Sequence, residues 1–227
     1  MIGAAALCPS APLLVPALGG AAPPLPELHR ATAEAVATLL DPAPGLVAVV
    51  GPAPATAEWP ADTAVDFGPF RGEATTAGPA LPLSLALGAT FLLDAGYAGA
   101  TLFQGVAPDA TPEACAELGA ALAGAAGTVA LLVVADGSAR RTLKAPGWFD
   151  DRASGFDAAV ERAVRDGDLV ALLDLDADLA ATLQATGRSS WQVLAGATRG
   201  TTVSTRVGYS DAPFGVGYLV ATIRVDT

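Results

Sequence analysis

The chain has 227 residues, which is enough for one domain that buries most of its apolar surface without disulfides or metals. Apolar residues make up 52% of it, a composition that argues for a packed globule and against disorder. The net charge of −11 would repel a phosphate backbone, so binding to nucleic acid is not expected.

The first part of the chain alternates between two hydrophobic patterns. Short apolar runs bounded by glycine and proline predict strands, and longer runs with apolar residues at helical spacing predict helices. Thr111 followed by a proline is typical of a helix start, and Gly96 is placed to end a helix. The predicted strands are residues 2–8, 46–50, 101–106 and 128–135, and the predicted helices are 24–40, 83–95 and 111–123.

The last third of the chain is acidic and amphipathic before it closes with two strands. Helices are predicted at 149–166, 168–175, 177–186 and 190–197, and strands at 201–207 and 215–225. The whole order predicts one α/β domain over residues 1–227, a three-layer αβα sandwich with a largely parallel or mixed central sheet. Ligands of such sheets gather at the carboxyl ends of the strands, so chemistry is expected in the loops 9–12, 51–54, 104–108 and 136–144.

Two uncharged stretches, residues 1–26 and 118–135, need a separate explanation. Several prolines interrupt the first and no basic residue precedes it, so it does not read as a signal peptide. Glycines divide the second, which a helix followed by a buried strand explains better than a membrane span. Cys8 and Cys115 form no CxxC pair, and two lone thiols favour a reducing cytoplasm.

Three segments resemble the class III extradiol dioxygenase subunit-B family, a superfamily that includes the Memo-like proteins. Residues 8–16 read CPSAPLLVP and are similar to the family opening C-P-H-P-P-L-L-V-P. Residues 136–141 read DGSARR and resemble the family segment G-D-x-S-H-R. The tail matches at 190–191, 196–197 and 213–218, so the resemblance runs in family order along most of the chain.

The resemblance implies a non-haem Fe(II) held by two histidines and a carboxylate, with another histidine as acid/base. In this sequence the three family histidines fall on Ser10, Pro54 and Ala139. The carboxylate ligand has no clear counterpart. His29 is the only histidine, so a two-histidine iron site within one chain is impossible.

The sequence therefore favours a non-catalytic relative with no catalytic residues, no metal ligands and no cofactor. Such a protein would act as a small-ligand-binding or protein-interaction module, and it could form a homo-oligomer. The alternative is an enzyme, either an iron-dependent dioxygenase with atypical ligands or one with new metal-free chemistry. Membrane binding is not expected.

A small anion is the ligand that the loop 136–144 would suit. Candidate ligand-binding residues are Ser10, Ser138, Arg140, Arg141 and Lys144, because the last three form the only basic cluster of an acidic chain. The competing interpretation is that nearby aspartates, namely Asp136, Asp150 and Asp151, neutralise this cluster.

Other residue groups have simpler explanations. Asp174, Asp176 and Asp178 lack the glycine and glutamate of a calcium loop and are expected to cap or face solvent. Asp150 and Asp151 are expected at a helix N-terminus rather than as an acid–base pair. His29 is expected on a solvated helix face, Cys8 as a buried inert thiol, and the loop serines in local hydrogen bonds.

Overall fold

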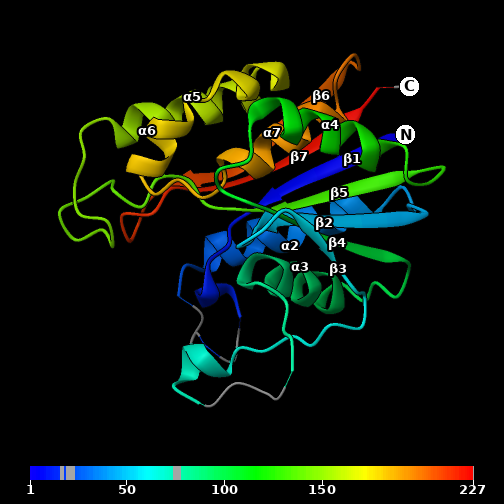
Figure 1. Cartoon of the computed structure of the whole chain (residues 1–227), viewed down its shortest axis with the longest axis horizontal. Coiled ribbons are helices and arrows are strands. Elements are labelled where there is room, and N and C mark those ends of the chain that lie inside the picture. The colour runs from blue at the N-terminus through cyan, green and yellow to red at the C-terminus, as the bar shows by residue number, and fades with distance from the viewer. Residues whose placement is uncertain (16–17, 19–23, 74–77, 227) are drawn as a thin grey trace.

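A seven-stranded mixed sheet lies between two layers of helices (Figure 1). The computed structural model describes residues 1–15, 18, 24–73 and 78–226. The three-layer α/β class predicted from the sequence is confirmed. The strands are β1 (Ile2–Cys8), β2 (Leu46–Pro52), β3 (Ala57–Trp59), β4 (Thr101–Val106), β5 (Val129–Val134), β6 (Val203–Asp211) and β7 (Tyr218–Val225).

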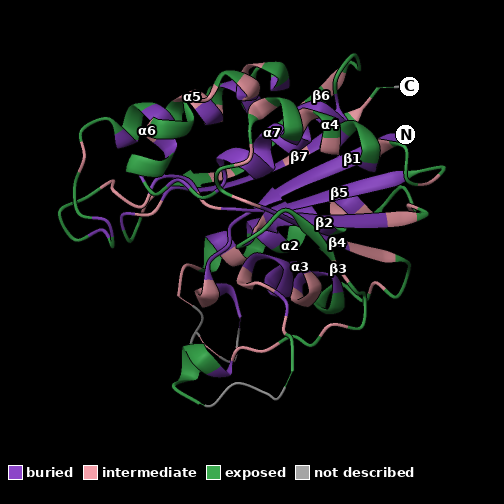
Figure 2. Ribbon diagram, in the orientation of Figure 1, coloured by how far each residue is buried: buried purple, intermediate pink, exposed green. Residues whose placement is uncertain are grey.

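The spatial order of the strands is β3-β4-β2-β5-β1-β7-β6. β1, β5, β2 and β4 are parallel to one another, while β3, β7 and β6 add antiparallel edges. β5 lies in the middle and all six of its residues are buried, because strands flank it and helices cover both of its faces. Figure 2 shows this burial along β1, β2 and β5.

Successive side chains of β5 point to opposite faces of the sheet, as in any strand, and therefore pack into two separate cores. Val129, Leu131 and Val133 pack under one helical layer, whereas Ala130, Leu132 and Val134 pack under the other. The first layer contains α4 (Pro112–Ala123), α5 (Ala153–Arg165), α6 (Ala177–Thr182), α7 (Arg188–Ala197) and the 3-10 helix Leu169–Asp174. The second contains α2 (Pro26–Leu40) and α3 (Leu83–Asp94), with a 3-10 turn at Pro12–Leu14. Another 3-10 turn, Gly68–Arg71, is exposed at three of its four residues.

Two glycines allow α4 and α7 to approach closely. A Cβ on Gly119 would lie 2.1 Å from the carbonyl oxygen of Val193, and one on Gly196 would lie 2.3 Å from that of Ala116. All ten residues of α7 are buried as a result. The helix therefore belongs to the core of its layer.

Most predicted elements are present, with shifted ends. The Thr111 hydroxyl caps α4 by accepting a hydrogen bond from the Ala114 N–H at 3.2 Å, and Gly96 follows α3 with a φ of +73°, as expected. The helix predicted from residue 149 begins only at Ala153, the one at 168–175 is a 3-10 helix, and β3 was not predicted. Among the described residues, no helix combines the length and the apolar character needed to cross a bilayer.

Candidate functional site

The three positions where the family resemblance places histidines follow three neighbouring strands. Ser10 lies after β1, Pro54 after β2 and Ala139 after β5, and these strands pair in parallel in the order β2-β5-β1. All three loops therefore meet the same edge of the sheet. Ser10 is buried, Ala139 is half-buried and Pro54 is exposed.

These positions do not fit an iron centre. Pro54 and Ala139 carry no side-chain atom that can bind a metal, and the Ser10 hydroxyl is a poor substitute for imidazole. Among the residues that the structure describes, no three His, Cys, Asp or Glu side chains gather closely enough to hold a metal ion.

Asp136 is the acidic group at the centre of this edge. Its Oδ1 accepts a hydrogen bond from the backbone N–H of Ser10 at 2.8 Å, and its own carbonyl oxygen accepts one from the Gly187 N–H at 2.9 Å. Burial raises the pKa of Asp136 to about 7, against the opposing effect of the Ser10 hydrogen bond. The nearby Tyr218 has a pKa of about 12, raised first by burial and then by the charge of Asp136.

A carboxyl group that titrates near neutrality could donate or accept a proton in a reaction. From the sequence, Asp136 was expected only to pair with the neighbouring arginines. Its position directly after the most buried strand was the available signal, because burial at that place raises the pKa of a carboxyl group.

Ser138 is fully buried and its polar atoms are engaged. Its N–H donates to Asp157 Oδ1 at 2.8 Å, its hydroxyl donates to the carbonyl oxygen of Leu183 at 3.2 Å, and the same hydroxyl accepts from the Arg140 N–H at 3.1 Å. These are the local hydrogen bonds expected for a loop serine. No free hydroxyl remains here for a ligand.

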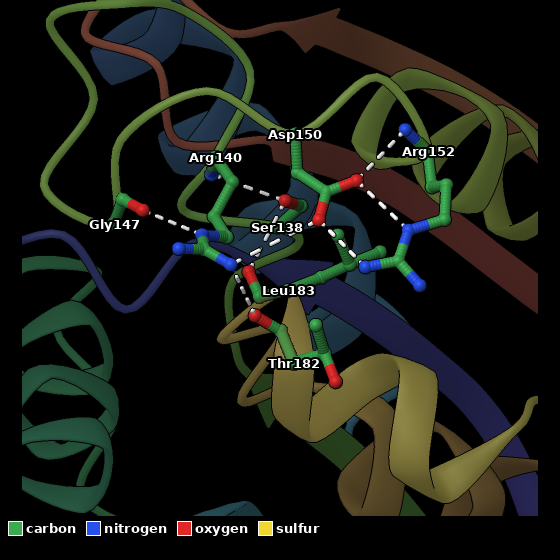
Figure 3. Close-up of polar contacts among 7 residues, drawn as sticks. All are labelled: Ser138, Arg140, Gly147, Asp150, Arg152, Thr182 and Leu183. Atoms are coloured by element: carbon green, nitrogen blue, oxygen red, sulfur yellow. Dashed lines mark hydrogen bonds and ion pairs between the residues drawn. The ribbon is translucent and has the colours of Figure 1, made fainter.

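Arg140 braces the loop that contains it (Figure 3). Its Nε donates to the carbonyl oxygen of Gly147 at 2.5 Å, and one terminal nitrogen donates to that of Thr182 at 3.1 Å. The same nitrogen lies 3.8 Å from Asp150. Asp150 in turn binds Arg152, and these hydrogen bonds lower the pKa of Asp150 to about 2.

Arg141 is also paired, with Asp157 in α5, which is not one of the three aspartates expected from the sequence. Its guanidinium lies 2.9 Å from Asp157 Oδ2. Burial raises the pKa of Asp157, while hydrogen bonds from Ser138 and Arg141 oppose the shift. Lys144 is exposed at the end of the same loop. An anion at residues 136–144 would have to displace existing partners of both arginines, so the geometry favours the ion-pair interpretation.

The other weighed residues have structural roles. Cys8 is buried and its pKa is raised to about 12 by burial, as expected for an inert thiol. Asp176 caps α6 through a 2.8 Å hydrogen bond from the Leu179 N–H. Asp150 binds the Arg152 N–H at 3.0 Å in the turn before α5, so it precedes that helix instead of starting it.

His29 is less exposed than its charged sequence neighbours suggest. The ring is half-buried, and Nε2 lies 3.2 Å from the Leu13 carbonyl oxygen, to which it donates in the tautomer that carries the Nε2 proton. His29 lines a cavity of about 490 Å³ between α2 and α3, together with Val36, Leu40 and Phe91. No motif or residue pattern in the sequence indicated this cavity.

Arg188 is a buried residue whose role the sequence does not reveal. It is 2% exposed and donates to the carbonyl oxygens of Ala110 and Pro108 and to Gln192 Oε1. These contacts tie the start of α7 to the loop that follows β4. Arg188 therefore supports the carboxyl edge from the helical layer.

Comparisons with known proteins identify the fold alone. No protein-family profile matches the chain. No curated protein matches it either. Among solved structures, the chain is similar to the crystal structure of the uncharacterized protein JW3007 from Escherichia coli K12, with a TM-score of 0.59 and 14% sequence identity over 98% of this chain and 99% of that chain.

Proposed function

We propose that this chain is a non-catalytic relative of the class III extradiol dioxygenases that works as a protein-interaction or small-ligand-binding module in the cytoplasm. The observation that carries the proposal is the occupation of the three family histidine positions by Ser10, Pro54 and Ala139 at one edge of the sheet. A facial triad needs two imidazoles, and the chain has one histidine in all.

His29 cannot compensate for the missing ligands from its observed place. It belongs to α2, and its ring contacts the Leu13 carbonyl oxygen instead of the loops that hold Pro54 and Ala139. The family reaction needs open metal positions for both catechol and O₂. The proposal therefore assigns no ring cleavage to this chain.

An oxygen-uptake assay with catechol and protocatechuate tests this proposal. Protein supplied with ferrous iron under air is expected to consume no more O₂ than the iron alone and to form no yellow ring-opened product. Product above the protein-free control, lost again in Ser10→Ala, would instead support the alternative of an iron-dependent dioxygenase with atypical ligands.

One cavity in the structure is a candidate site for a small ligand. The cavity between α2 and α3 has a volume of about 490 Å³, which lies in the range of small-molecule sites, and its walls include Leu14, Val36 and Phe91. Ala37 lines it from the exposed side of α2. A thermal-shift screen of small apolar compounds tests this role: a stabilising compound should lose its effect in Ala37→Trp, which fills the cavity.

The anion site at residues 136–144 stays a prediction. Both arginines already have partners, and Lys144 is exposed at the end of the loop. Screening small carboxylates and phosphate at about millimolar concentration tests it, because a charge-assisted contact of about 1.5–3 kcal/mol would raise the melting temperature measurably.

A further inference from the structure

Two loops at the carboxyl edge expose four large apolar side chains. These are Leu143, Trp148 and Phe149 after β5 and Phe214 between β6 and β7, with exposed fractions of 64%, 66%, 48% and 51%. We call them the loop-tip patch. The loops are joined, because the Arg141 N–H donates to the Gly215 carbonyl oxygen at 3.0 Å. Figure 1 shows both loops projecting together beyond the sheet.

The backbone conformation at Trp148 is energetically unfavourable. Its φ is +64°, in the left-handed region that bulky residues avoid. Contacts on both sides fix this conformation: the Trp148 N–H donates to Ala145, Arg140 Nε donates to the carbonyl of Gly147, and the Asp150 N–H donates to the carbonyl of Arg140. Figure 3 shows how Arg140 reaches both Gly147 and Asp150. Hydrogen bonds within the loop therefore fix the backbone at the exposed Trp148.

A hollow lies in the same surface. It has a volume of about 470 Å³ and is lined by Leu143, Lys144, Pro213 and Phe214, with Thr142. An aromatic side chain that enters a pocket is the usual centre of a protein interface. A two-fold contact between identical chains needs a self-complementary surface, and a projecting indole beside a hollow on one pair of loops can supply it.

The charges around the patch also fit a second copy. Lys144 is the only lysine of the chain, and two exposed aspartates flank the patch: Asp151 in the loop after β5 and Asp211 at the end of β6. A self-complementary contact needs both signs on one face. The net charge of −11 disfavours a nucleic acid or an anionic membrane as the occupant.

We propose that the loop-tip patch is a self-association surface, in which two copies of this chain pack about a two-fold axis with Trp148 of each in the hollow of the other. The three aromatic side chains contribute roughly 300 Å² of exposed apolar area per copy. A stable interface buries about 800 Å² per partner, so the contact should be reversible and weak. This inference does not depend on the proposed loss of catalysis.

Sedimentation velocity of the full chain tests the surface, over loading concentrations from about 1 to 200 µM, where weak interfaces populate. The wild type is expected to shift from monomer to dimer. Trp148→Ser should weaken association about tenfold or more. Leu93→Ser is the matched control, because Leu93 is 74% exposed on α3, and it should associate like the wild type.

A charge exchange tests whether the partner is a second copy. Lys144→Glu and the double variant Asp151→Lys/Asp211→Lys should each self-associate more weakly than the wild type. An equimolar mixture of the two should form heterodimers more tightly than either does alone. Circular dichroism and thermal melting check that every variant is folded.

Three results would overturn the inference. They are a wild type that stays monomeric at about 200 µM, a Leu93→Ser variant that loses association as strongly as Trp148→Ser, and a charge-exchanged mixture no tighter than its components. Monomeric protein that instead binds anionic vesicles or another protein through Trp148 would also reject the second copy as the occupant.

Discussion

The backbone N–H of Ser10 donates a 2.8 Å hydrogen bond to the carboxylate of Asp136, which joins the loop after β1 to the loop after β5. Ser10 stands where the family resemblance places a metal-binding histidine, and its backbone N–H is bonded to the Asp136 carboxylate. The pKa of Asp136 is still raised to about 7, because burial outweighs this one hydrogen bond. This edge of the sheet therefore contains a carboxyl group whose ionisation near neutral pH lowers the stability of the fold.

Replacing Asp136 by asparagine should stabilise the protein at pH 8. Folded Asp136 holds its proton up to about pH 7, whereas the unfolded carboxyl loses it near pH 4, so its contribution to stability is lost as the pH rises between these values. Asparagine keeps an acceptor for the Ser10 N–H. The expected gain at pH 8 is about 1–2 kcal/mol, less than full linkage gives because water reaches part of the side chain.

Urea denaturation at pH 8 and pH 4 measures this gain, which should disappear at the lower pH. Asp150→Asn is the control of opposite sign, because the pKa of Asp150 is lowered to about 2 and its charged form favours the fold above about pH 4. Asp150→Asn should therefore destabilise at pH 8. An Asp136→Asn variant no more stable than the wild type at pH 8 would refute the raised pKa.

Removing Arg141 should destabilise the fold without changing anion binding. The variant Arg141→Ala leaves the partly buried Asp157 carboxylate without its cation, which should cost about 1–3 kcal/mol. The pKa of Asp157 should rise further, so the loss should grow as the pH increases. Arg30→Ala is the control, since Arg30 forms an exposed pair with Glu34 and should cost below about 0.5 kcal/mol.

Urea denaturation of both arginine variants, with and without millimolar phosphate, provides the measurement. Equal stability losses in Arg141→Ala and Arg30→Ala would show that the Asp157 pair is not partly buried in solution. A phosphate stabilisation present in the wild type and absent in Arg141→Ala would restore the anion site.

A methyl group at Gly119 should break the contact between α4 and α7. The added Cβ would lie 2.1 Å from the Val193 carbonyl oxygen, which belongs to helix backbone and cannot move aside easily. The expected loss for Gly119→Ala is about 2–3 kcal/mol or more. Gly155→Ala, in α5 with nothing near its added Cβ, should instead stabilise by up to about 1 kcal/mol. Thermal melting compares the two, and a neutral Gly119→Ala would contradict the close packing.

The fold was predictable because burial and hydrophobic pattern agree along most of the chain. The run 128–135 indicated a strand buried on both sides, and β5 is that strand. β3 was not predicted because a strand of three residues, two of them exposed, leaves little hydrophobic pattern at a sheet edge. The run 168–175 has the composition of a helix but folds as a 3-10 helix, a difference in hydrogen bonding that periodicity cannot resolve.

The site was predictable only in part. Ser10, Pro54 and Ala139 could be predicted to lie at one edge, because each follows a parallel strand and the carboxyl ends of such strands lie together. Loop position did not identify Asp157 as the partner of Arg141, because that contact joins a loop to a helix whose packing depends on the whole layer. The exposure of Trp148 was equally hidden, because it depends on one left-handed residue.

Iron binding tests the central claim most directly. Isothermal titration of the wild type with Fe(II) under anaerobic conditions, followed by dialysis and metal analysis, should show no stoichiometric iron. The variant Ser10→His/Pro54→His/Ala139→His should bind iron more tightly than the wild type or Ser10→His alone, though weakly, since the supporting groups are not built for it. Retention of about one equivalent of iron by the dialysed wild type would contradict the proposal that this chain has lost the family metal site.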